Sequence, residues 1–218
     1  MRAVRIALWL AGAALCARLL LAATGERHVP AGHRFLSVDK AAVHYAVALL
    51  AITVGLVLWD RRPESLTGPL LTAASFAYVL SELDPLFRHS RLGLTVALVA
   101  SPLLVALFAH LFLAYPSGRL GSPLERVFVA GVYAVELAFV VPFLLWYDAG
   151  SYVVDGVRIE CRSCGATPLT SVGWHDLTGV GRVRDGVTLA VIAALAVLVT
   201  AKLVRAAPGP RRVLLPCA

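Results

Sequence analysis

Six long apolar runs separated by short polar breaks dominate this sequence. Each is close to the length of about 20 residues that an α-helix needs to cross the hydrocarbon core of a bilayer. Because lipid offers no hydrogen-bond partner to an open strand edge, runs of this length predict membrane-spanning helices. The expected spans are residues 4–24, 41–59, 66–83, 92–115, 127–146 and 187–204.

Three of the spans depart from a uniform apolar pattern. Arg2 and Arg5 precede the first run, as in a signal peptide, but the run is longer than a signal core and Arg18 interrupts it, so we expect an uncleaved span. Pro102 lies inside the fourth span and predicts a kink. The third span is the weakest, because hydroxyl side chains dilute it, which suits a helix packed among other helices: Thr67, Thr72, Ser75 and Ser81.

Composition supports a membrane protein. The chain has 218 residues, of which 59% are hydrophobic and only 15% are charged, against about 45–50% and 25% in soluble domains. We therefore expect an all-α polytopic bundle over residues 1–206, and no stretch is polar enough for a separate soluble domain. The net charge of +7 does not indicate nucleic-acid binding, because most Lys and Arg residues flank the apolar runs, where they anchor helices in the bilayer.

The distribution of Lys and Arg predicts an orientation in the cell membrane. With the N-terminus inside, ten basic residues lie near inner span ends and nine near outer ones, so both termini are expected in the cytoplasm. The inner set is Arg2, Arg5, Arg61, Arg62, Arg119, Arg126, Lys202, Arg205, Arg211 and Arg212. The outer set is Arg27, Arg34, Lys40, Arg88, Arg91, Arg158, Arg162, Arg182 and Arg184.

The longest connection, residues 148–186, is expected outside the cytoplasm. Strand-like pieces at residues 152–154 and 156–159 predict a small hairpin. Cys161 and Cys164 follow it, and an oxidising compartment would favour a disulfide. A redox or metal sensor and a pair of free thiols remain alternatives, and two cysteines alone do not make a zinc site. The sequence therefore predicts no resident metal and no cofactor.

Ionisable residues within the spans are functional candidates, because an uncompensated charge in lipid is expensive. Glu136 lies near the middle of the fifth span, and His110 or Arg18 would be its partner. The alternatives are a paired structural group and a polar ligand pocket or proton-sensitive switch. His44 is expected near the outer interface as a neutral histidine.

The break between the fourth and fifth spans has the residues of a tight cytoplasmic turn. It reads Tyr115-Pro116-Ser117-Gly118-Arg119-Leu120. Pro116 biases Tyr115 away from helical geometry, and Gly118 permits a positive φ. Ser122 is placed to cap the next helix, with Pro123 at its first position and Glu125 completing a capping box. Ser117 has no base nearby and is expected to be a turn residue, not a nucleophile.

The sequence from His110 to Leu120, followed by Arg126 and Tyr133, resembles the N-terminal membrane region of actinobacterial sensor histidine kinases of two-component systems. Such regions have a Phe/Tyr-Pro-Ser/Thr-Gly-Arg-Leu turn and, further on, a loop with Cys and an Asn/Thr-Pro-Leu. The second part corresponds here to residues 161–169, and the basic segment at 209–216 also resembles the family. The likeness covers residues 60–218, with two cysteines where one is commoner.

The resemblance implies a signal-input region that passes a shift in helix packing to a cytoplasmic homodimer. A response regulator would be a partner only with a kinase core, and the chain contains no phosphoacceptor helix and no ATP-binding segment. Enzyme activity is therefore undecided, and residues 207–218 are expected to be a truncated basic tail or the end of a stand-alone relative. The alternative is an integral membrane protein such as a transporter component or a scaffold. Pro102 and Pro142 do not correspond as in an inverted repeat, which argues against transport.

Overall fold

The structure, a computed structural model, describes residues 2–25, 38–81, 91–146, 151–154, 157–160 and 177–205. Within these residues the chain forms six α-helices and one two-stranded sheet. The expected all-α bundle with a small hairpin is confirmed. The elements are α1 (Arg2–Gly25), α2 (Val38–Arg61), α3 (Thr67–Ser81), α5 (Arg91–Ala114), α6 (Pro123–Trp146), β1 (Ser151–Val154), β2 (Val157–Glu160) and α7 (Thr178–Arg205).

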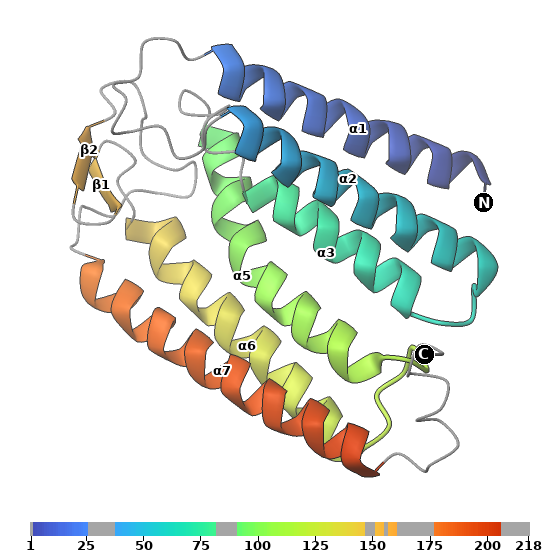
Figure 1. Cartoon of the computed structure of the whole chain (residues 1–218). Helices are drawn as coiled ribbons and strands as arrows, with labels where there is room; N and C mark the ends of the chain where they lie inside the picture. Colours follow the sequence, from blue (N-terminus) through green and yellow to red (C-terminus); the bar gives the residue numbers. More distant parts are fainter. Residues whose placement is uncertain are drawn as a thin grey trace.

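The helices lie side by side in chain order, with α1 at one edge of the bundle and α6 and α7 at the other (Figure 1). Neighbours along the chain run in opposite directions, so the chain reverses at alternate ends. Residues 62–66 and 115–122 form two of these reversals, at the end that also holds the start of α1 and the end of α7 (Figure 1). We call this the turn end. The β1–β2 hairpin lies at the opposite end.

Five of the helices are long enough and apolar enough to cross a membrane. The candidate spans are Ala3–Leu21, Ala42–Arg61, Thr95–Ala114, Pro123–Trp146 and Gly179–Val204. The sixth, α3, has 15 residues, or about 22 Å at 1.5 Å per residue, against a hydrocarbon core of about 30 Å. The third expected span is therefore a helix, but as described it is shorter than the bilayer core.

Close backbone contact fixes α3 against α2. A Cβ built on Gly68 would lie 2.4 Å from the backbone nitrogen of Trp59, and one on Gly55 would lie 2.5 Å from Thr72 Oγ1. The Thr72 hydroxyl donates to the Gly68 carbonyl at 2.9 Å, and Ser75 donates to Leu71 O at 2.8 Å. The hydroxyls of Thr72 and Ser75 are thus satisfied within their own helix. Small residues are what allow two helices in a membrane to approach so closely.

Two apolar clusters join the helices. One links α1, α2, α3 and α5 through Cys16, Leu19, Tyr45, Ala48, Val79 and Ala97. The other links α5 and α6 through Ala106, Ala109 and Val132, with Val191 and Leu195 of α7 packed against it. Pro102 is part of α5, and the axis of this helix bends along its length in Figure 1, as a proline within a helix predicts.

The expected hairpin is present. β1 and β2 pair antiparallel, with Ser151 opposite Glu160 and Val154 opposite Val157. The two strands match the strand-like pieces in the sequence. Cys161, Cys164 and the tail at residues 207–218 lie outside the described residues, so the predictions about them stay predictions.

Candidate functional site

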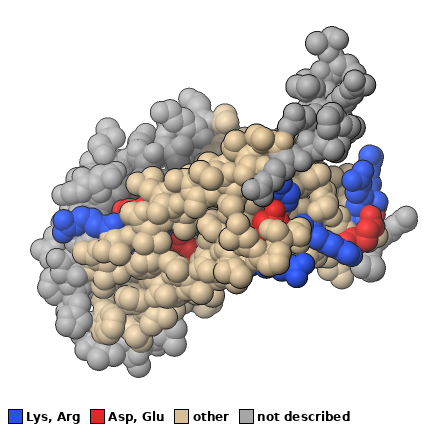
Figure 2. Space-filling model, turned by 90° about the horizontal axis from the view of Figure 1, so that it is seen from below, with Lys and Arg blue, Asp and Glu red and all other residues tan. Residues whose placement is uncertain are grey.

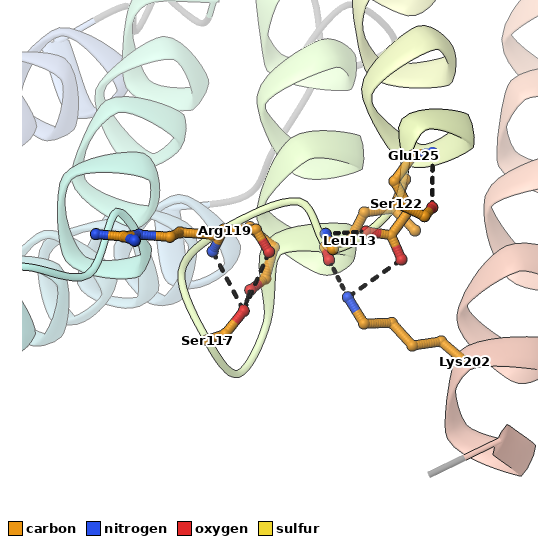
Figure 3. Close-up of polar contacts among 8 residues, drawn as sticks. Leu113, Ser117, Arg119, Ser122, Glu125 and Lys202 are labelled. Atoms are coloured by element: carbon orange, nitrogen blue, oxygen red, sulfur yellow. Dashed lines mark hydrogen bonds and ion pairs between the residues drawn. The ribbon is translucent and has the colours of Figure 1, made fainter.

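The Tyr115–Leu120 segment closes α5 with a turn held by its own side chains. The helix ends at Ala114, whose carbonyl accepts the N–H of Gly118 at 2.8 Å. Ser117 Oγ accepts the N–H of Arg119 at 3.3 Å and donates to the Arg119 carbonyl at 3.0 Å (Figure 3). The serine therefore satisfies backbone groups of the turn. The Arg119 side chain points away from it and is exposed.

Gly118 is fixed by both conformation and space. Its φ is +76°, and a Cβ there would lie 2.1 Å from Ser65 Oγ and 2.7 Å from the backbone nitrogen of Leu66. Residues 62–66 connect α2 to α3, so the two reversals of the turn end are packed on each other. The glycine in the motif thus joins the α5–α6 hairpin to the α2–α3 hairpin.

We expect Gly118→Ala to lower stability by about 2–3 kcal/mol, because both positive φ and overpacking are unfavourable for alanine. Gly121→Ala is the matched control, since its Cβ would meet only Glu125 Oε2 at 3.6 Å. Thermal unfolding in detergent micelles measures the difference. Equal midpoints for the two variants would contradict the close packing at Gly118.

The first turn of α6 is capped as predicted. Pro123 begins the helix, and Ser122 Oγ accepts the N–H of Glu125 at 3.2 Å. Glu125 Oε2 accepts from Gly121 N–H at 2.6 Å, one residue earlier than the cap position of a standard capping box. Its other carboxylate oxygen is left for a different partner.

That partner is Lys202, in the last turns of α7. Lys202 Nζ lies 3.4 Å from Glu125 Oε1 and also donates to the carbonyl of Leu113, at the end of α5 (Figure 3). A cation placed on the last carbonyls of a helix is favourable because it satisfies an acceptor that has no helical partner. Lys202 thus connects three helix ends, and we call this contact the Lys202 latch.

One face of α7 carries side chains that contact α5 and α6. It contains Arg184, Thr188, Val191, Leu195 and Lys202, spaced as one face of a helix requires. Polar residues stand at both ends of this α7 seam and apolar residues lie between them. Elsewhere the helix presents apolar side chains outward, among them Leu189, Ile192 and Val197.

Glu136 of α6 is the centre of the polar cluster at the far end of the seam. Its side chain is 1% exposed, and Oε1 accepts from Thr188 at 3.5 Å. Arg184 Nε lies 3.9 Å from Oε2, and the same guanidinium donates to Ser101 Oγ of α5 at 3.2 Å. Oε2 itself receives no hydrogen bond. The cluster therefore joins α5, α6 and α7 around one buried carboxylate.

The other residues predicted with Glu136 lie apart from it. His110 makes an edge contact with Tyr133, with ring centroids 6.2 Å apart, and no ion pair or hydrogen bond joins it to Glu136 in the described part of the chain. Arg18 is exposed on α1, at the opposite edge of the bundle. His44 lies elsewhere and shares a 2.7 Å hydrogen bond with the Tyr78 hydroxyl. Glu136, His110 and Arg18 thus lie at three separate positions in the bundle and do not form one pocket.

Arg184 and Lys202 were missed by sequence reasoning for different reasons. The sequence predicts Arg184 in the loop, because the apolar run begins at residue 187, whereas α7 begins at Thr178. The spacing of Arg184, Thr188, Val191 and Leu195 is the signal that could have found it. For Lys202 the sequence predicts only an anchor at a span end, since a sequence does not show which carbonyl lies beside a lysine.

The contacts that define these clusters are ion pairs, hydrogen bonds and apolar packing. Ser117 has only backbone partners recorded for its hydroxyl, and the described residues contain no group of His, Cys, Asp and Glu able to hold a metal ion. Five helices with the length and hydropathy of membrane spans decide the class of protein. This chain is a multi-pass helical membrane protein. Comparisons with protein-family models, curated proteins and solved structures find no match.

Proposed function

We propose that the chain is the membrane-embedded input region of a two-component sensor histidine kinase, or a relative of one without the kinase core. The resemblance of the Tyr115–Leu120 turn first suggested this role. The observation that carries it is the Lys202 latch, because it joins α7 to the two helix ends that flank this turn. A signal that moves the α5–α6 hairpin would therefore act directly on α7, which leads toward the C-terminus.

The contacts of α7 suit a helix that changes position. Lipid tails are as apolar as leucine, so an apolar seam alone gives little preference for one helix position over another in a bilayer. The polar contacts at Glu136 and at the latch supply that preference. Coupling of this kind needs two helix arrangements of similar free energy, and weakening either contact would shift their balance.

The orientation is part of the same proposal. The turn end holds Arg5, Arg61, Arg62, Arg119, Arg126 and Lys202, and Figure 2 shows charged side chains gathered mainly toward that end. A cytoplasmic turn end follows from the preference of Lys and Arg for the inner side. Both termini would then lie in the cytoplasm, where α7 would meet a kinase core and its partner copy in a homodimer.

The DNA that follows codon 218 provides the first test. An in-frame phosphoacceptor-histidine helix and an ATP-binding core would support the proposal, and the extended protein should then phosphorylate itself with ATP in vesicles. A stop codon together with solute flux in reconstituted vesicles would instead favour the alternative, a transporter component.

Lys202→Met should loosen the end of α7 without unfolding the protein. The latch is partly exposed, so its ion pair contributes only about 0–1 kcal/mol, which is too little to abolish folding. Spin labels at the exposed positions Leu124 and Val197 should show a broader distance distribution in the variant. In the extended kinase, basal autophosphorylation should change roughly fivefold, as about 1 kcal/mol allows.

Arg126→Gln is the control for this experiment. It removes a positive charge one residue from Glu125, on an exposed side chain outside the latch. Its distance distribution should match that of the wild type. A broadened distribution in both variants would show that net charge, and not the latch, positions α7.

A further inference from the structure

A groove between α1 and α2 at the turn end has the character of an amphiphile site. Its volume is about 340 Å³, and it is open along one side. Charged residues line the end of the groove near residues 62–66. Mainly apolar residues line the part farther along α1 and α2 from that end. The lining residues are Arg5, Ile6, Trp9, Thr53, Leu56, Val57 and Asp60.

Arg5 provides the polar end of the groove. Its side chain is 14% exposed and contacts Asp60, whose side chain is 59% exposed. The contact uses one terminal nitrogen of the guanidinium, which carries five N–H donors in all. Asp60 is the partner recorded for Arg5 among the described residues. The other N–H groups of the Arg5 guanidinium can therefore donate hydrogen bonds to an anionic ligand.

The part of the groove farther from residues 62–66 is mainly apolar, and hydrogen bonds fix the position of its tryptophan. The Trp9 indole N–H donates to Thr53 Oγ1 at 3.0 Å, and Thr53 in turn donates to Leu49 O at 2.8 Å. Ile6 is 60% exposed and Val57 is 45% exposed, so both present methyl groups to the surrounding lipid. A tryptophan within about two helical turns of the span end is typical of the depth where lipid headgroups meet acyl chains.

The local charge favours an anionic ligand. Arg61 and Arg62 follow Asp60 and are exposed, and Glu64 is the next acid along the chain. Three arginines against two carboxylates leave this corner with one excess positive charge. A helix end with such an excess attracts anionic lipid at a membrane surface, by about 1 kcal/mol for each basic residue.

We propose that this groove binds the headgroup of one anionic phospholipid. Its phosphodiester accepts hydrogen bonds from the Arg5 guanidinium, and the start of an acyl chain lies along Ile6, Trp9 and Val57. Asp60 contacts the same guanidinium and competes with the phosphodiester for its donors. The site lies on the α1–α2 edge, away from the Lys202 latch, and does not depend on a signalling role.

Native mass spectrometry of the full chain with defined lipids tests the site. The wild type should retain one phosphatidylglycerol more strongly than one phosphatidylcholine. Arg5→Gln should weaken phosphatidylglycerol binding about fivefold, the equivalent of one basic residue. Asp60→Asn should retain the lipid at least as well as the wild type, because it removes a competing carboxylate while Arg5 remains.

Arg119→Gln is the matched control, since it removes an exposed arginine from the same end of the bundle but from outside the groove. Thermal unfolding of each variant shows whether it is folded. An Arg5→Gln protein that binds like the wild type would overturn the proposal. So would an equal loss in Arg119→Gln, an equal loss in Asp60→Asn, or equal retention of the two lipids by the wild type.

Discussion

Gly68→Ala is expected to destabilise the protein by about 3 kcal/mol, the upper part of the range for overpacking. The added methyl group would lie 2.4 Å from the backbone nitrogen of Trp59 and 2.7 Å from its Cα. Both atoms belong to the α2 backbone, so no side-chain rotation can relieve the contact. Relief would require α3 to move away from α2, which would also disturb the packing of Gly55 against Thr72.

Gly131→Ala is the control for this prediction. Gly131 is an exposed glycine of α6, and a Cβ there meets no atom within 4 Å. Alanine favours a helix by about 1 kcal/mol over glycine, so this variant should be neutral or slightly more stable. Thermal unfolding in the same micelles should therefore shift the two variants in opposite directions. A Gly68→Ala protein as stable as Gly131→Ala would contradict the close approach of α2 and α3.

The bundle was predictable because its signal is repeated in every span. Each apolar run corresponds to one of the six helices, although α7 begins at Thr178, well before its apolar run. Local chemistry also predicted the cap at Ser122. The length of α3 was harder to predict, because Gly68, Thr72 and Ser75 are compatible with either a full span or a short packed helix. The close approaches of Gly68 to Trp59 and of Gly55 to Thr72 show how tightly this segment is held.

The partners of Glu136 and Glu125 could not be predicted, because they depend on how α7 lies on the hairpin. The sequence predicts His110 or Arg18 as the partner of Glu136, because these are ionisable residues within other spans. The structure places it with Arg184, Thr188 and, through Arg184, Ser101. Pairing between helices distant in sequence is set by packing, and the helical spacing along α7 was the one local sign of it.

Glu136→Ala is expected to destabilise the bundle by about 2 kcal/mol. Breaking a buried ion pair by removing one partner costs about 3–5 kcal/mol, but the Arg184 side chain is 25% exposed and water would screen part of the loss. Arg184 would keep only its hydrogen bond to Ser101. Glu136→Gln should lose less, because an amide oxygen still accepts from Thr188. Glu64→Ala, which removes an exposed acid at the turn end, should change stability by less than about 0.5 kcal/mol.

A double-mutant cycle separates the pair from the other contacts of each residue. Glu136→Ala and Arg184→Ala together should cost about 1 kcal/mol less than the sum of the two, within the range found for polar contacts between membrane helices. Additive losses would show that the 3.9 Å approach contributes nothing. If the cluster also sets the position of α7, Glu136→Gln in the extended kinase should alter autophosphorylation while expression stays normal. Unchanged autophosphorylation would leave Glu136 a purely structural residue and remove the far end of the α7 seam from the signalling proposal.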